Sequence, residues 1–173
     1  MTARVLVTYA SKHGATAEIA EKIKSTLLQH GLFADILPAD EVTNPAPYQA
    51  VVLGSAVYVG QWRRSAVRFL REHRQALAGK QVWLFSSGPT GKGEPESLLN
   101  GWTVPANVKP VVDQLKPRDV AVFGGTLSDA KMNFFEKWII RKVKAPVGDF
   151  RNWDAIEQWA QGIASDLKDS VTV

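Results

Sequence analysis

The sequence contains no cysteine among its 173 residues. This absence excludes disulfides, thiolate nucleophiles, iron–sulfur clusters and cysteine-ligated zinc sites. We predict no metal site, so any redox chemistry must come from a bound cofactor.

Long apolar runs are also missing, because no stretch approaches the roughly 20 residues that a membrane-spanning helix needs. The chain enters a strand-like pattern at Arg4, with no signal-peptide pattern before it. We therefore expect a cytoplasmic protein. Charged residues at 22% and hydrophobic residues at 45% are typical of a globular chain, and residues 1–173 suit a single domain.

Short apolar runs alternate with helical patterns along the chain. The runs are rich in β-branched and aromatic residues and end in small or turn-forming ones, which is typical of strands buried on both faces. The predicted strands are Val5–Tyr9, Phe33–Leu37, Ala50–Gly54, Gln81–Phe85 and Val120–Gly124. Apolar residues at helical spacing lie between them, as in Ala20, Ile23 and Leu27, in Ala66, Phe69, Leu70, His73 and Leu77, and in Val108, Val112 and Leu115.

This alternation predicts an α/β fold with a parallel sheet and right-handed crossovers. Five strands fit the order 2-1-3-4-5 in a three-layer α/β/α sandwich, with the ligand crevice outside the carboxyl ends of strands 1 and 3. The last helix is expected to begin at Asp154, with Glu157 in a capping-box relation. Ser86–Pro105 and Thr126–Trp153 are too long for simple turns, and we interpret about 126–153 as an insertion.

The turn after the first strand carries the clearest motif. It consists of Ser11, Lys12, His13, Gly14, Ala15 and Thr16, after which the helix opens. Polar side chains, a glycine and successive N–H groups at a helix N-terminus suit a terminal phosphate. The spacing is neither that of a Walker loop nor that of the dinucleotide fingerprint. The alternative is an ordinary strand-to-helix turn capped by Thr16.

This segment resembles the phosphate-binding signature of flavodoxins. The positions that carry the resemblance are Val7, Tyr9, Ser11, Gly14, Thr16, Ala20 and Ile23. One position departs, since Thr8 stands where the family usually has an apolar residue. The resemblance implies the flavodoxin-like fold and FMN as cofactor.

The resemblance also implies two loops around the isoalloxazine ring. The loop Gly54–Trp62 would cover one face and contribute Ser55, Ala56, Val57, Tyr58, Gly60 and Trp62. The loop after the fourth strand would contact the pyrimidine edge and the other face through Ser86, Ser87, Gly88, Pro89, Thr90 and Gly91. Either Tyr58 or Trp62 is expected to form an aromatic wall, the alternative being that both pack beneath the loop.

The second half is similar to the menaquinone-dependent protoporphyrinogen oxidase branch of this superfamily. The similarity lies in Gly54–Trp62, Ser65–Phe69, Val120–Leu127 and Phe134–Val143 with Trp153 and Asp154. The stretches 144–152 and Ser86–Pro105 depart from the branch. The similarity implies an FMN-dependent oxidoreductase of haem biosynthesis that takes electrons from a small substrate and passes them to a quinone or another acceptor. The alternative is a flavodoxin-type shuttle between redox partner proteins, although such shuttles are usually acidic and this chain has a pI near 9.4. A third reading is a fold that has lost its cofactor.

Residues 131–144 contain five Lys or Arg and one acid, Glu136. The excess of positive charge in this segment therefore equals the net charge of +4 of the whole chain. Phe135, Trp138 and Ile139 share a helical face. This face either packs in the core or forms an interfacial surface for a peripheral membrane contact. Alternatively, the basic residues bind an acidic redox partner or the carboxylates of a substrate. No nucleic-acid module is predicted. His13 is interpreted as a phosphate contact or an exposed residue, and no catalytic residue is assigned.

Overall fold

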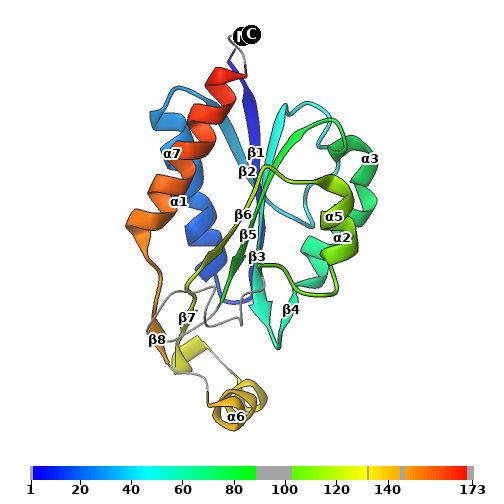
Figure 1. Ribbon diagram of the computed structural model, residues 1–173. Helices are drawn as coiled ribbons and strands as arrows, with labels where there is room; N and C mark the ends of the chain where they lie inside the picture. Colours follow the sequence, from blue (N-terminus) through cyan, green and yellow to red (C-terminus); the bar gives the residue numbers. More distant parts are fainter. Residues whose placement is uncertain (1, 89–102, 132, 145–146, 171–173) are drawn as a thin grey trace.

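Five long parallel strands form the centre of the protein in the computed structural model, which describes residues 2–88, 103–131, 133–144 and 147–170. These strands are β1 (Arg4–Ala10), β2 (Phe33–Pro38), β3 (Ala50–Tyr58), β5 (Gln81–Ser87) and β6 (Asp119–Phe123). They lie in the order β2-β1-β3-β5-β6, and the two-residue β4 (Gln61–Trp62) pairs antiparallel with β3 (Figure 1). The predicted order 2-1-3-4-5 of the long strands is therefore confirmed.

Helices cover both faces of the sheet (Figure 1). One face carries α1 (Ala15–Gln29) and α7 (Trp153–Asp169), and the other carries α2 (Arg64–Glu72), α3 (Arg74–Leu77) and α5 (Lys109–Leu115). Successive residues of β1 point to opposite faces, so Val5 and Val7 join the core under α1 and α7, while Leu6 and Ala10 join the other. The three-layer sandwich is thus confirmed.

Two helix predictions need correction. The apolar pattern through His73 and Leu77 is broken at His73, which ends α2 and begins α3. The last helix begins at Trp153, because the side chain of Asn152 accepts the N–H of Ala155 and caps it. Asp154 therefore lies inside the first turn.

The loop predicted from Gly54 to Trp62 is largely a hairpin. Strand β3 continues to Tyr58, and Val57 and Tyr58 pair with Trp62 and Gln61 of β4. Between them, Val59 and Gly60 have φ angles of 50° and 69°. Positive φ at both central residues is the two-residue hairpin turn whose twist matches that of the flanking strands. Val59 stands where such turns usually have Asn before Gly, so this turn has no clear signal in the sequence.

The 126–153 segment projects beyond the carboxyl end of the sheet (Figure 1). It contains β7 (Thr126–Leu127), a 3-10 turn (Asp129–Lys131), α6 (Phe134–Val143) and β8 (Gly148–Asp149). Strands β7 and β8 pair antiparallel, which ties the two ends of the segment together. Among the helices that the structure describes, none has the length and apolar character to cross a membrane.

Candidate functional site

A cleft opens where β1, β3, β5 and β6 end. Its lining contains the predicted residues Ser11, Lys12, His13, Ala15, Thr16, Ala56, Val57, Tyr58, Ser87 and Gly88, together with Gly125, Thr126 and Leu127. Four segments that are distant in sequence thus meet at one place. The last three residues were missed, although two glycines directly after the fifth strand are a signal of close backbone approach.

The Ser11–Thr16 loop leaves the first turn of α1 open to a ligand. Gly14 takes the left-handed conformation with φ 93°, and its N–H donates to Ser11 Oγ at 2.9 Å. None of the described side chains caps α1, whereas Asn133 caps α6 and Asn152 caps α7. The uncapped N–H groups and the helix dipole favour an anion, so the loop fits a phosphate group.

Three predicted site residues lie beneath the cleft. Trp62 is only 3% exposed, and its Nε1 donates to Ser86 Oγ at 2.8 Å. Ser86 Oγ in turn donates to the carbonyl of Thr103 at 2.7 Å. Buried Ser55 accepts the N–H of Arg63 at 3.0 Å. These bonds fix the ends of the loops, so Trp62, Ser55 and Ser86 support the cleft from below.

Tyr58 is the aromatic residue that lines the cleft. It is half-buried, and the ammonium of Lys12 lies 4.1 Å from the centroid of its ring. Gly60 lies at the exposed tip of the hairpin. Pro89, Thr90 and Gly91 lie outside the described residues. Of the two aromatics considered from sequence, only Tyr58 borders the space where a planar ring would bind.

Close backbone packing shapes the opposite wall. A Cβ at Gly125 would lie 2.6 Å from Gly88 Cα, and one at Gly88 would lie 2.9 Å from the carbonyl oxygen of Val57. Gly88 also has φ 154° and donates its N–H to Phe123 O at 3.3 Å. Side chains are therefore excluded here, which brings backbone groups from three strands to the edge of the cleft.

A buried carboxylate joins the phosphate loop to α6. Glu136 is 3% exposed, forms an ion pair with Lys12, and has an oxygen 3.5 Å from His13 Nε2. Its other oxygen accepts the N–H of Asn133 in the capping box of α6. Burial, with a contribution from Arg63, lowers the pKa of Lys12.

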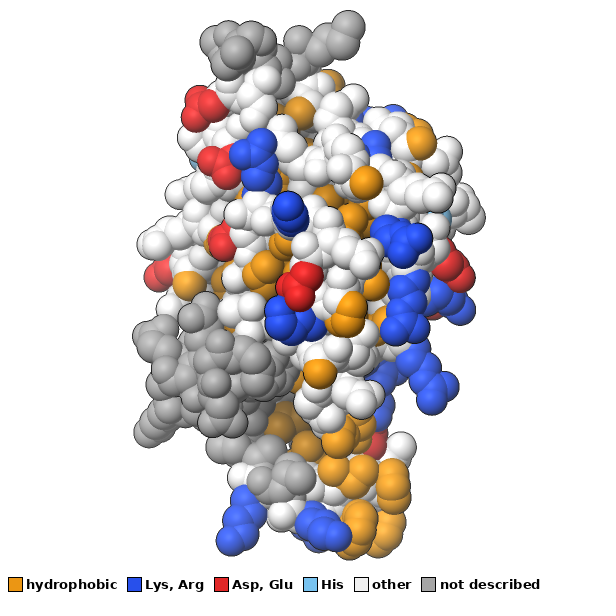
Figure 2. All heavy atoms as spheres, turned by 45° about the vertical axis from the view of Figure 1, so that its right-hand side comes forward, with side chains coloured by type: hydrophobic (Ala, Val, Ile, Leu, Met, Phe, Trp, Pro, Cys, Tyr) orange, Lys and Arg blue, Asp and Glu red, His pale blue; other side chains and the backbone are white. Residues whose placement is uncertain are grey.

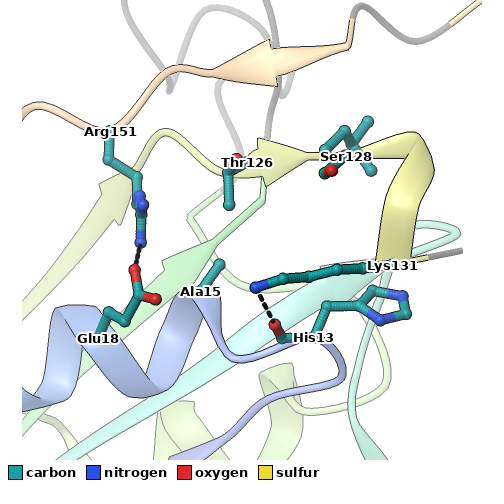
Figure 3. Close-up of a pocket in the computed structure, with 8 residues that line it drawn as sticks. His13, Ala15, Glu18, Thr126, Ser128, Lys131 and Arg151 are labelled. Atoms are coloured by element: carbon teal, nitrogen blue, oxygen red, sulfur yellow. Dashed lines mark hydrogen bonds and ion pairs between the residues drawn. The ribbon is translucent and has the colours of Figure 1, made fainter.

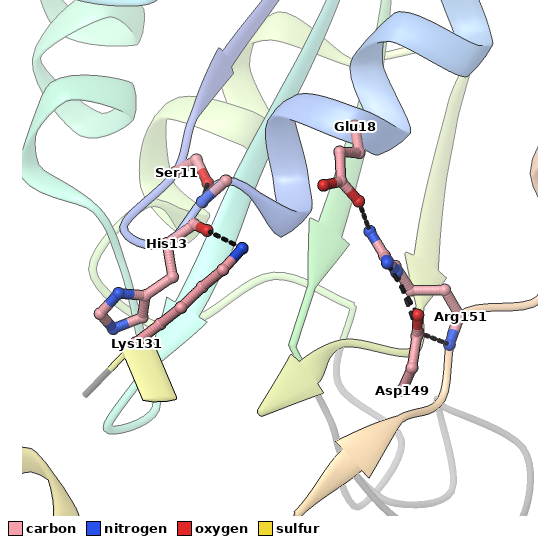
Figure 4. Close-up of polar contacts among 7 residues, drawn as sticks. Ser11, His13, Glu18, Lys131, Asp149 and Arg151 are labelled. Carbon is pink, nitrogen blue, oxygen red and sulfur yellow. Dashed lines mark hydrogen bonds and ion pairs between the residues drawn. The ribbon is translucent and has the colours of Figure 1, made fainter. Parts of the chain in front are cut away.

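Cations gather around the same loop (Figure 4). Lys131 reaches across from the 126–153 segment and donates to the carbonyl of His13 at 3.4 Å. Burial lowers the pKa of His13, and the nearby charges of Lys12, Lys131 and Arg63 lower it further. These effects favour the neutral imidazole, whose ring offers one donor and one acceptor.

The outer face of α6 carries exposed aromatic side chains. Phe134, Phe135 and Trp138 are 85%, 64% and 52% exposed. The rings of Phe135 and Trp138 stack at 6.1 Å, and Lys142 Nζ lies 5.0 Å from the Trp138 centroid. Figure 2 shows hydrophobic side chains gathered at this end of the molecule, with Lys and Arg beside them. The core-packing interpretation of this helical face is therefore wrong.

Comparison with known proteins agrees with this arrangement. A family model described as the flavodoxin domain matches residues 6–153. The chain is 21% identical over 172 residues to protoporphyrinogen IX dehydrogenase (quinone) of Escherichia coli strain K12, covering 93% of this chain and 94% of that protein.

Solved structures share the fold. A flavodoxin from the domain Archaea superposes with a TM-score of 0.62 at 15% identity, covering 95% of this chain and 99% of the other. The rubredoxin oxygen:oxidoreductase of Desulfovibrio gigas gives a TM-score of 0.63 at 13% identity, covering 98% of this chain and 37% of the other. With most of its length matched by the family model, the chain belongs to the flavodoxin domain family.

Proposed function

We propose that this protein is an FMN-dependent oxidoreductase, with residues 1–173 as one cofactor-binding domain and the 126–153 segment as an insertion. The observation that carries the proposal is the cleft where an uncapped helix N-terminus meets two further loops. The helix N-terminus suits a phosphate, and the two loops suit a planar ring with polar edges.

The residues divide by the part of FMN that each would hold. Ser11 to Thr16 would bind the phosphate, and Tyr58 would flank the ring system. Ser87 and Gly88 would offer backbone groups to its edge. When bound, FMN supplies the electron and hydride transfer, while the protein positions it and sets its surroundings. No side chain is assigned as a catalytic acid or base.

Binding of FMN is the first test. Purified protein should quench the fluorescence of added FMN, and the double variant Ser11→Ala/Thr16→Ala should bind more weakly. Each lost charge-assisted hydrogen bond is worth about 1.5–3 kcal/mol. Ser25→Ala is a matched control, because Ser25 is exposed on α1, well beyond its first turn. Unchanged affinity in the double variant would place the cofactor elsewhere, and absence of FMN binding would overturn the proposal.

The substrate and acceptor are proposed from the curated relative, whose name states dehydrogenation of protoporphyrinogen IX with a quinone. Turnover of protoporphyrinogen with a menaquinone analogue would support this reaction. The second candidate is an electron shuttle between protein partners, which the fold of the flavodoxin neighbours favours. Reduction by a flavodoxin reductase, without turnover of the porphyrinogen, would identify the shuttle.

We also propose that α6 makes a peripheral contact with an anionic membrane surface. Its outer face combines exposed Phe134, Phe135 and Trp138 with the basic residues Lys137, Arg141 and Lys142, while its single acid, Glu136, is buried. Aromatic rings at the headgroup level with flanking cations are typical of interfacial helices. Proximity to a bilayer would bring the cleft close to a lipid-dissolved quinone.

Co-sedimentation with anionic vesicles tests this contact. Lys137→Glu/Arg141→Glu/Lys142→Glu should abolish binding that the wild type shows. The matched control reverses three exposed arginines of α2, Arg64, Arg68 and Arg71. Equal loss in both variants would indicate general charge attraction and overturn an α6-specific contact.

A further inference from the structure

Beside the cleft lies a second pocket, which the 126–153 segment closes (Figure 3). It is lined by His13, Ala15, Glu18, Thr126, Leu127, Ser128, Lys131 and Arg151. Four of these residues, His13, Ala15, Thr126 and Leu127, also line the cleft, so the two spaces lie side by side at the start of α1. The pocket therefore adjoins the N–H groups that would receive the phosphate.

Besides Arg63, whose charge acts on Lys12 and His13, three cations lie around this region, and carboxylates hold two of them. Lys12 forms an ion pair with Glu136. Arg151 binds Asp149 in bidentate fashion, with Nε and Nη2 donating at 2.9 and 2.7 Å, and also pairs with Glu18. The hydrogen bonds to Asp149 are the main cause of a raised pKa for the Arg151 guanidinium. Its charge thereby neutralises Glu18, which would otherwise repel an anion at the helix start.

Lys131 is the third of these cations, and none of the carboxylate side chains that the structure describes pairs with it. Its only hydrogen bond within the described ranges of the chain is the long one, 3.4 Å, to the carbonyl of His13. An ammonium has three donors, so at least two are available. Figure 3 shows the side chain extended along the pocket, with its nitrogen beside His13 and Ala15.

We propose that Lys131 makes the cofactor site selective for the phosphorylated flavin, by adding a charge from the 126–153 segment to the Ser11–Thr16 loop. This inference rests on the proposed FMN function. The loop supplies N–H and hydroxyl donors, and Lys131 adds a positive charge beside them, whereas the charges of Lys12 and Arg151 are paired with carboxylates. Riboflavin carries no phosphate, so its binding gains nothing from Lys131.

The experiment compares the dissociation constants of FMN and riboflavin by fluorescence quenching. Lys131→Met should weaken FMN binding by about tenfold to a hundredfold, the range for one charge-assisted hydrogen bond. Riboflavin binding should stay unchanged, and the affinity for FMN should become less dependent on salt. Lys131→Arg, which keeps the charge, should retain most of the preference for FMN.

Lys137→Met is the matched control, because it removes the same charge from α6 and should leave both affinities unchanged. Equal weakening of FMN and riboflavin in Lys131→Met would mean that Lys131 only anchors the segment on the loop. Unchanged FMN affinity would also overturn the inference, while FMN binding by the wild type would keep the proposed function intact. A wild-type protein that binds neither flavin would overturn both.

Discussion

Helix α7 packs its apolar face against the rest of the protein, whereas helix α6 packs a polar face and leaves its aromatic face exposed. Both are amphipathic, and both begin at an asparagine cap. Helix α7 buries its apolar residues, including Ile156, Ala160 and Ile163, against the sheet. Helix α6 buries an acid, Glu136, and leaves Phe134 and Trp138 exposed. The same periodic signal therefore belongs to a core helix in one case and to a surface helix in the other.

The difference follows from what each helix packs against. A sheet surface is apolar, so α7 gains free energy by covering it with apolar side chains. Helix α6 lies over the loop Ser11–Thr16, which carries Lys12 and His13, and a carboxylate is the group that these neighbours favour. We therefore expect the stability of the fold to depend on the apolar face of α7. The function of the site should depend on the polar face of α6, which contacts the Ser11–Thr16 loop.

Truncation of the apolar faces gives the largest expected contrast. Ile156→Ala should destabilise the protein by about 2–5 kcal/mol, because Ile156 is fully buried and its removal leaves a cavity. Trp138→Ala should change the free energy of unfolding by about 1 kcal/mol or less, because the ring is half-exposed and loses only its contacts with Phe135 and Lys142. Urea unfolding of both variants measures the difference. A cost for Trp138→Ala equal to that of Ile156→Ala would show that α6 belongs to the core.

The fold followed from the sequence because buried parallel strands and their helices carry strong periodic signals. Strands β1, β2, β5 and β6 lie within a residue or two of their predicted bounds. The hairpin at Val59 and Gly60 was missed, because a β-branched residue rarely takes positive φ and so gives no turn signal.

The site was predictable only in part. The Ser11–Thr16 motif is local, and it could be read directly from the chain. The contacts of Glu136, Lys131 and Arg151 join residues more than a hundred positions apart, which no spacing rule reveals. The sum of charges was also a poor guide to where basic residues lie. It located the positive charge in 131–144 alone, although α2 carries the exposed arginines Arg64, Arg68 and Arg71.

The ion pair beneath α6 gives a smaller effect that sharpens the comparison. Glu136→Gln keeps the size of the side chain and a hydrogen bond to Asn133, but it removes the charge that pairs with Lys12. The free energy of unfolding, measured by urea unfolding, should fall by about 1–3 kcal/mol, because the charge-assisted contact between Lys12 and the buried carboxylate is lost. Asp113→Asn is the control, since its pair with Lys109 is more than half exposed on both sides and should contribute well under 1 kcal/mol. Equal effects would mean that the buried acid does not hold α6 in place.

The pH dependence of stability is the smallest expected effect, and it also separates the two helices. The pKa of His13 is lowered from 6.5, mainly by burial, so below about that pH the unfolded chain binds more protons than the folded one. The free energy of unfolding should therefore fall as the pH drops through the unfolded value toward the lowered one. His13→Gln should remove this part of the dependence.

Lys131→Met should raise the pKa of His13, measured by NMR, because one of the charges that lower it is gone. The buried face of α7 carries no titratable side chain, so Ile156→Ala should leave the titration of His13 unchanged. A midpoint for His13 above 6.5 would show that Glu136, rather than the cations, dominates its surroundings.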